Sequence, residues 1–223
     1  SKVQGLGLFA TKDFAEDTFR TLTAVDSVIL VIDVSKGVEE QTEKLVEVCR
    51  MRNIPIIVFI NKLDREGKDA FDLLDEVEQK LGLTVTPLSF PIGMGYDFKG
   101  IYNIWEQNIK LFQEEEKQII GEIKIFNSLE DPMLKSIIGN ERYKKQKEEL
   151  DLIQGVYQVF DQKKFLEGKL HPVFFGSALN NFGVEQLLNC FIEIAPEPLP
   201  KSTIERIIQP NEKYFTGFVF KIH

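Results

Sequence analysis

Three short segments of almost unbroken apolar sequence dominate the hydrophobic pattern, at residues 27–34, 54–60 and 172–175. They are rich in valine, isoleucine and phenylalanine, which fit the pleated surface of a strand. Apolar and polar positions do not alternate within them, and such runs are typical of parallel strands that are covered on both faces. Pro55 lies near the start of the second run, where a strand tolerates proline. The pattern predicts three buried parallel strands.

Each predicted strand is followed by a segment whose apolar residues recur with the period of an α-helix. They lie at i, i+4, i+7, i+8 and i+11 from Val38, at helical spacing through residues 71–81, and at i, i+3, i+4, i+7 and i+8 from Val184. Strands that alternate with amphipathic helices are typical of an α/β fold with a doubly wound sheet. Because such crossovers are right-handed, the loops after Ile60 and Phe175 should meet at the carboxyl edge of the sheet, where ligands bind.

The stretch between the second and third strands is longer than this scheme needs by about ninety residues. Much of the stretch is highly charged, which is typical of solvated helix faces. We therefore predict a core domain made of residues 1–84 and 169–195. Residues 85–168 are expected to form an inserted subdomain with a small helical body.

The last part of the chain differs in character from the core. Residues 196–200 read Pro-Glu-Pro-Leu-Pro, which predicts a stiff, extended linker. Residues 215–222 form a strand-like run, and a lone strand is not a stable domain. We interpret residues 196–223 as a linker and the start of a second domain.

Composition changes the picture mainly by exclusion. The chain has 43% hydrophobic and 28% charged residues, and its 27 basic and 35 acidic residues give a net charge of −8. The negative charge argues against bulk binding to nucleic acid, so no DNA partner is expected. The longest apolar run is too short to cross a bilayer and no leader sequence opens the chain, so we expect a cytoplasmic protein with no membrane partner. Cys49 and Cys190 lie in apolar helical stripes, which predicts buried free thiols and disfavours a zinc site.

The most informative polar residues come directly after the second strand, in Asn61-Lys62-Leu63-Asp64. A carboxylate at Asp64 can accept two parallel hydrogen bonds, and guanine offers two adjacent donors. Adenine would leave that carboxylate facing an acceptor, which costs desolvation energy. The Lys62 stem can lie along a base while its ammonium stays in water, and the Asn61 amide can tie neighbouring loops together. The same residue types also occur in ordinary turns, so the run alone leaves both interpretations open.

A second turn, Gly176-Ser177-Ala178-Leu179, ends the third strand in the corresponding place. Its small residues allow the backbone to approach the edge of a ring, and the N–H of Ala178 is placed to donate to a guanine carbonyl. Both turns lie at the ends of strands of one sheet, so together they predict a guanine-binding site.

Asn61-Lys62-Leu63-Asp64 and Ser177-Ala178-Leu179 resemble the N-K-x-D and S-A-x guanine-recognition motifs of the translational GTPases. Longer runs resemble the bacterial peptide chain release factor 3 family, and the likeness covers nearly everything after Asp13. These runs are residues 13–26, 59–65, 73–78, 90–93, 98–100, 172–179, 181–184, 195–196 and 215–222.

The resemblance implies a P-loop GTPase-like domain with an inserted subdomain, followed by the first strand of a β-barrel domain. It also implies GTP or GDP as the ligand, bound through Asn61, Lys62, Asp64, Ser177, Ala178 and Leu179. The ribosome and class I release factors are the implied partners, with a role in translation termination.

The chain departs from this family in the half of the site that binds phosphate. No G-x-x-x-x-G-K-[ST] phosphate loop occurs in the 223 residues, and residues 7–12 read Gly-Leu-Phe-Ala-Thr-Lys where the family has a D-T-P-G-H sequence. We therefore predict a core domain truncated at its N-terminus, which does not hydrolyse GTP and has no catalytic or metal-binding residues of its own. Mg²⁺ is expected only in a protein that also has the phosphate loop. A non-catalytic interaction module derived from a GTPase, binding the ribosome or a protein, is the alternative.

The missing phosphate-loop strand would leave one edge of the strand at residues 28–34 unpaired, which invites pairing with another chain. Dimerisation and a patch formed by residues 2–9 of the same chain are the two expectations. Residues 5–10 also fit a G-x-G-x-x-[GA] dinucleotide sequence, but too few residues precede it for the required strand, and a nicotinamide-dependent enzyme is disfavoured.

Overall fold

The computed structural model describes residues 7–9, 21–22, 24–112, 124–217 and 219. Among these, no helix is long and apolar enough to cross a membrane.

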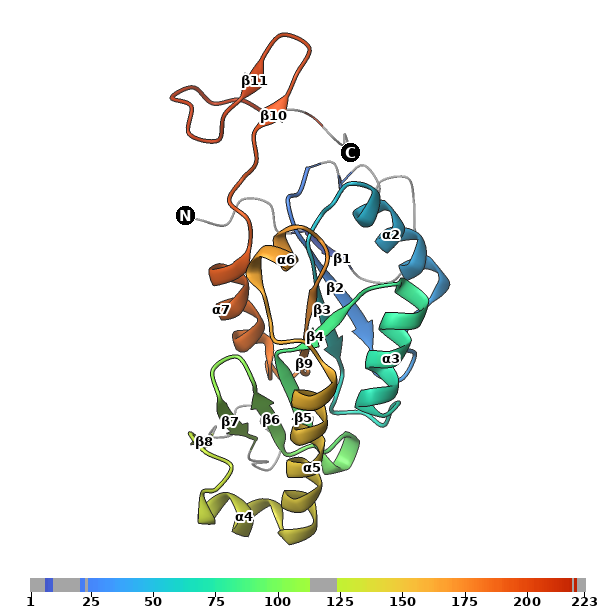
Figure 1. Ribbon diagram of the computed structural model, residues 1–223, viewed down its shortest axis with the longest axis vertical. Coiled ribbons are helices and arrows are strands. Elements are labelled where there is room, and N and C mark those ends of the chain that lie inside the picture. Colours follow the sequence, from blue (N-terminus) through green and yellow to red (C-terminus); the bar gives the residue numbers. More distant parts are fainter. Residues whose placement is uncertain (1–6, 10–20, 23, 113–123, 218, 220–223) are drawn as a thin grey trace.

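The centre of the molecule is a five-stranded parallel sheet in the order β1-β2-β3-β9-β4 (Figure 1). Its strands are β1 (Gly7–Phe9), β2 (Val28–Asp33), β3 (Ile56–Asn61), β4 (Val85–Pro87) and β9 (His171–Phe175). The three predicted strands are β2, β3 and β9. They lie side by side in the middle of the sheet, and the predicted α/β fold is confirmed.

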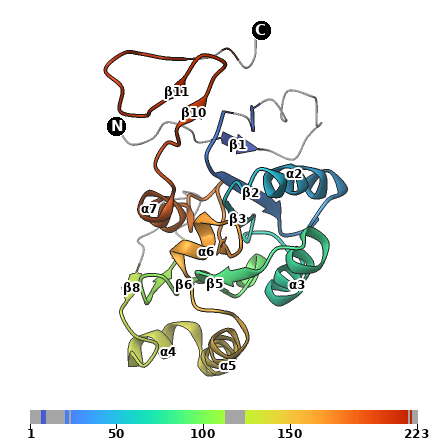
Figure 2. The same cartoon turned by 45° about the horizontal axis from the view of Figure 1, so that its top comes forward.

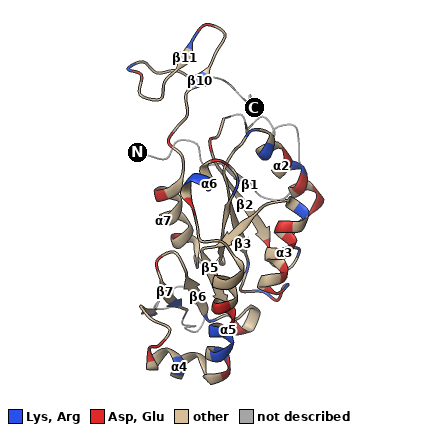
Figure 3. Cartoon of the chain, in the orientation of Figure 1, with Lys and Arg blue, Asp and Glu red and all other residues tan. Residues whose placement is uncertain are grey.

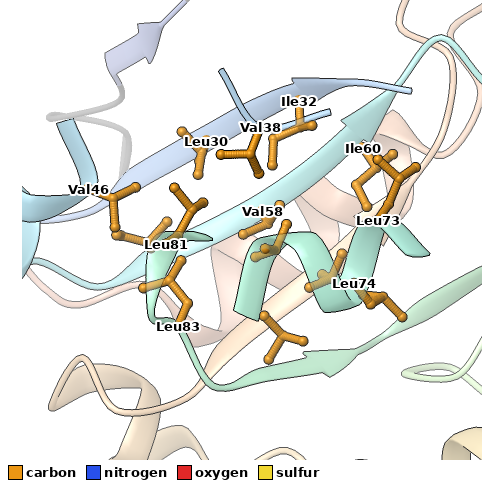
Figure 4. Close-up of a cluster of buried hydrophobic side chains, with 14 of the residues drawn as sticks. Leu30, Ile32, Val38, Val46, Val58, Ile60, Leu73, Leu74, Leu81 and Leu83 are labelled. Atoms are coloured by element: carbon orange, nitrogen blue, oxygen red, sulfur yellow. The ribbon is translucent and has the colours of Figure 1, made fainter. Parts of the chain in front are cut away.

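Helices cover both faces of this sheet, as a doubly wound fold requires. Helices α2 (Glu40–Met51) and α3 (Ala70–Leu81) pack on one face, where alternate residues of β2 and β3 point toward them (Figure 4). Helix α7 (Val184–Ile194) packs on the other face with the short helix α6 (Gln162–Leu166). This second core contains Ile29, Ile57, Phe59, Phe165, Phe174, Leu187, Cys190 and Ile194. Each middle strand buries the side chains on both faces of the sheet, which is why its sequence is a continuous apolar run.

The edge of β2 is partly covered by the chain itself. Strand β1 pairs in parallel with β2, with Gly7 opposite Val28 and Phe9 opposite Leu30. This supports the predicted patch as far as Gly7–Phe9, while residues 2–6 lie outside the described part of the chain. The pairing reaches only the first half of β2.

The inserted segment contains a second sheet, so its predicted helical body was incomplete (Figure 2). Its four antiparallel strands, in the order β5-β6-β7-β8, are β5 (Ser89–Ile92), β6 (Gly100–Asn103), β7 (Asn108–Leu111) and β8 (Lys124–Phe126). They are three or four residues long, β5 contains a proline and β6 begins with a glycine, so they carry little strand signal.

Helical structure completes the insertion. It consists of the 3-10 turn η1 (Gly95–Asp97), α4 (Pro132–Ile138) and α5 (Asn140–Val156). Helix α4 and the sheet share a small core of their own. The exposed side of α5 carries charges of both signs, as predicted for a solvated face (Figure 3). Strand β4, which lies within the stretch assigned to the insertion, pairs with β9 of the central sheet.

After α7 the chain runs away from the body of the molecule (Figure 1). Two short strands, β10 (Lys201–Ser202) and β11 (Ile207–Ile208), pair with each other. The strand expected at residues 215–222 is not formed at residues 215–217 or 219, and its other residues lie outside the described part.

Candidate functional site

The turns that follow β3 and β9 meet at the carboxyl edge of the central sheet. Strand β3 pairs with β9 up to Ile60 and Phe175, and the N–H of Gly176 donates to the Ile60 carbonyl oxygen at 2.9 Å. Lys62 then adopts a left-handed backbone conformation with φ 71°, which is uncommon for a residue with a side chain. This sharp bend turns the next residues toward the β9 turn, and the N–H of Leu63 donates to the Gly176 carbonyl oxygen at 3.2 Å.

The Asn61 side chain ties the two turns together. Its Oδ1 accepts a hydrogen bond from the Lys62 N–H at 2.8 Å and another from the Ala178 N–H at 2.8 Å. The predicted tie through the Asn61 amide is therefore present. The N–H of Ala178 was expected to donate to a guanine carbonyl, but in the structure it donates to Asn61 Oδ1 instead.

A second link joins the acidic residue of one turn to the serine of the other. The Ser177 hydroxyl donates to Asp64 Oδ1 at 2.5 Å, and Ser177 is fully buried. Asp64 is partly exposed, and within the described residues its Oδ2 accepts no hydrogen bond from the protein. A carboxylate has about four acceptor positions, so Asp64 keeps most of its capacity for a ligand.

Lys62 extends from the same turn to the end of the neighbouring strand β2. Its Nζ lies 2.5 Å from Asp33 Oδ2, and its side chain is 40% exposed. Partial burial acts to raise the pKa of Asp33, but hydrogen bonds from Lys62 and from the hydroxyl and N–H of Ser35 outweigh it and lower the pKa to about 2. Asp33 is therefore charged at neutral pH, and it fixes the end of the lysine side chain.

Leu179 is exposed to solvent, with a relative exposure of 70%, and its neighbour Ala178 is exposed as well. The backbone N–H of Leu179 makes no hydrogen bond within the described part of the chain. It lies one residue beyond Ala178, so it is the free donor of this turn.

Together these groups offer what a purine ring with adjacent donors needs. Asp64 supplies acceptors, the Leu179 N–H supplies a donor, and the Lys62 stem supplies an apolar surface. The chain has no G-x-x-x-x-G-K-[ST] loop, and no group of three or more His, Cys, Asp or Glu side chains among the described residues is arranged to hold a metal ion. The groups at this edge are an acceptor, a donor and an apolar surface of the kinds that a guanine base can contact.

A hollow of about 890 Å³ lies elsewhere, between the start of α3, η1 and the start of α5. Its wall carries acidic and basic side chains in similar number, among them Asp97, Arg142, Lys145 and Glu149. No residue of the two turns lines it.

Sequence reasoning missed two residues that shape this edge. Asp33 is the last residue of β2 and lies opposite Asn61 in the sheet, so a polar residue at the carboxyl end of an adjacent strand was a usable signal. Phe182 lies beyond the second turn and closes it, because Ser177 and Phe182 exchange backbone hydrogen bonds of 2.8 and 2.9 Å. An apolar residue in a loop gives no such signal in sequence.

Comparison with known proteins gives a family and a fold. Residues 11–197 match the family described as the Elongation factor Tu GTP binding domain. A crystal structure of the protein ttk003000868 from Thermus thermophilus is similar, with a TM-score of 0.58 and 21% sequence identity over 82% of this chain. The chain spans 28% of the length of that protein, and at this identity the likeness shows the fold alone.

Proposed function

Because the chain belongs to the Elongation factor Tu GTP binding domain family, we propose that the turns after β3 and β9 form its guanine-recognition site. The observation that carries the proposal is the pair of side-chain links between the turns. Asp64 bonds Ser177 and Asn61 bonds Ala178, so the acidic residue and the backbone donors are held on one edge of the sheet.

In this site the Asp64 carboxylate accepts the ring N–H and the exocyclic amine of guanine. The N–H of Leu179 donates to the guanine carbonyl oxygen, which is the role first assigned to Ala178. Adenine presents an acceptor at its ring nitrogen and an amine where guanine has its carbonyl, so it leaves both protein groups unpaired. Unpaired buried groups of this kind cost about 1–3 kcal/mol each, which favours guanine over adenine.

The chain binds nucleotide weakly and does not hydrolyse GTP in this proposal. Charge-assisted contacts to phosphate contribute roughly 1.5–3 kcal/mol each, and the 223 residues have no loop to make them. Base contacts alone support a Kd of about 1 mM. Guanosine, GMP and GDP should therefore bind with similar affinity.

The test is a titration of the chain with guanosine, GDP and adenosine, followed by backbone NMR. We expect shifts at the two turns, near-equal affinity for guanosine and GDP, and weaker binding of adenosine. The variant Asp64→Asn should lose preference for guanine and gain xanthine, because an amide presents one donor and one acceptor, matching the carbonyl and ring N–H of xanthine. Equal affinities for guanosine and adenosine would refute the site.

We further propose that the chain serves in translation termination, on the ribosome and with class I release factors as partners. The long sequence runs that resemble the release factor 3 family support this finer assignment, while the family match supports a translational GTPase domain. The test is co-sedimentation with ribosomes, with and without a bound class I release factor. Preferential binding to the former is expected, and equal binding to both would contradict the assignment.

A non-catalytic interaction module derived from a GTPase, binding the ribosome or a protein, is the alternative. This alternative predicts ribosome or protein binding that does not respond to guanosine or GDP at millimolar concentration. Absence of any shift in the nucleotide titration, together with retained co-sedimentation, would support it over the guanine site.

A further inference from the structure

Both turns of the candidate site are held from one side by the insertion. The contact to the second turn is aromatic. Phe182 is 3% exposed, and its ring stands nearly perpendicular to two rings of the insertion. The centroid distance is 5.3 Å to Phe98 and 5.6 Å to Phe112. Edge-to-face pairs at these distances are favourable beyond the apolar area they bury.

Phe98 and Phe112 are themselves fixed to each other by the insertion. Phe98 follows η1, and Phe112 follows β7. The N–H of Phe112 donates to the carbonyl oxygen of Lys99 at 2.7 Å, which keeps the two phenylalanine-bearing segments side by side. The two rings are therefore held in fixed positions on either contact of the Phe182 ring.

The contact to the first turn is a backbone hydrogen bond. The N–H of Gly95, in η1, donates to the carbonyl oxygen of Leu63 at 2.9 Å. Gly95 has φ 61°, a left-handed backbone conformation that favours glycine. Leu63 is fully buried between the two residues that face the ligand, Lys62 and Asp64.

We propose that the insertion is a positioning element for guanine recognition, in which Phe98 and Phe112 clamp Phe182 and thereby hold the Ser177–Leu179 turn in the geometry that reads the base. The inference rests on the proposed guanine site and names a regulatory device for it. A turn held in its bound geometry binds without the entropy cost of ordering, so loosening the clamp weakens binding. By thermodynamic linkage, a partner that shifts Phe98 or Phe112 alters guanine affinity, and guanine alters the affinity for that partner by the same factor.

The chain offers matched variants for the test. Phe98 and Phe112 are half-buried, so Phe98→Ala and Phe112→Ala remove the clamp without emptying a core. Phe160 is also half-buried and makes an edge-to-face pair with Trp105 at 5.4 Å, on the side of the sheet packed by α7. Phe160→Ala removes the same kind of pair and is the control. Phe112→Tyr keeps the ring and should behave like the parent.

The first measurement is amide hydrogen exchange in the absence of nucleotide. In Phe98→Ala and Phe112→Ala, the amides of Ser177 and Phe182 should exchange at least tenfold faster, while that of Val58 in β3 stays at its parent rate. Global destabilisation would accelerate all the slow amides together, so this selectivity reports on the clamp. Unchanged exchange at Ser177 and Phe182, uniform acceleration that includes Val58, or the same acceleration in Phe160→Ala would overturn the inference.

The second measurement is guanosine affinity in the same variants. Both alanine variants should bind at least threefold more weakly than the parent, with Phe160→Ala and Phe112→Tyr unchanged. If the parent binds no guanosine, the proposed function fails, while the exchange rates still decide whether the insertion holds the turn. If the parent binds guanosine and the clamp variants bind it equally well, the positioning role is refuted and the guanine site stands.

Discussion

The ion pair between Asp33 and Lys62 gives a quantitative test of how the site is built. The variant Asp33→Asn keeps an oxygen that can accept the hydrogen bonds of the Ser35 N–H and hydroxyl, which measure 2.9 and 2.6 Å. It replaces the Oδ2 atom that accepts the Lys62 hydrogen bond with a neutral NH2 group, so both the negative charge and that hydrogen bond are lost. The variant should therefore lose the stabilisation that lowers the Asp33 pKa, with little change in the local fold.

The magnitude follows from the pKa of Asp33. A carboxyl whose pKa falls from 3.8 to about 2 on folding stabilises the folded state by at most about 2.5 kcal/mol at neutral pH. The Lys62 side chain is 40% exposed, and solvent screening reduces the effect. We expect Asp33→Asn to lower the free energy of unfolding by about 1–2 kcal/mol at pH 7.

The sign of the pH dependence is fixed by the direction of the shift. Because the folded pKa is lowered, the stabilisation is fully present above pH 3.8 and is lost as the pH falls toward 2. The gap between parent and variant should be constant from pH 7 to pH 4.5 and shrink to about half at pH 3.

Urea unfolding followed by circular dichroism measures this gap. Glu40→Gln is the control, since Glu40 pairs with Lys44 at 2.9 Å on the exposed side of α2, and it should leave the unfolding midpoint unchanged. A gap below about 0.5 kcal/mol at pH 7, or one equally large at pH 3, would refute the assigned role of the ion pair.

Three further predictions concern the core. Burial lowers the pKa of His171, so the folded state resists its protonation. The free energy of unfolding should therefore fall as the pH drops below about 6.5. In His171→Gln the urea midpoints at pH 7.5 and 5.5 should converge. Phe174→Ala should lower that free energy by about 3–5 kcal/mol, and the exposed Leu179→Ala by no more than about 0.5, as calorimetry can check. Burial raises the pKa of the Cys49 thiol to about 11 and of the Cys190 thiol to about 12. A thiol reagent at pH 8 should therefore label neither cysteine until the chain is unfolded, and rapid labelling of the folded chain would contradict this.

The hydrophobic pattern was sufficient for the central sheet because its middle strands are buried on both faces. Residues 28–32, 56–60 and 172–175 are all apolar, so the continuous apolar runs mark the strands directly. The joining of the two turns also followed from the pattern, since parallel strands bring their carboxyl ends to one edge.

The strands of the insertion leave only a weak signal in the sequence, for the opposite reason. They are three or four residues long. They form because the strands pair with each other and pack against α4 in the small core, and local strand propensity contributes little. The same holds for β4, which looks like irregular sequence and becomes a strand because β9 offers it an edge.

Which atoms a side chain uses lies beyond what the sequence can show. The sequence places Asn61 and Ala178 at the same edge of the sheet. Only the structure shows that the Ala178 N–H donates to the Asn61 side-chain oxygen, while the Leu179 N–H has no partner among the described residues. Lys62 has a left-handed backbone and its Nζ pairs with Asp33, and no spacing rule predicts either.

The sheet order has a consequence for how the chain acquires its site during synthesis. Strand β3 ends at Asn61 and its neighbour β9 begins at His171, so about 110 residues must be made before the two can pair. Closing so long a loop is entropically unfavourable, and an insertion that collapses early on its own core shortens the distance to be spanned. A growing chain therefore displays the first turn long before the second exists, and the proposed guanine site can form only after β9 has been made.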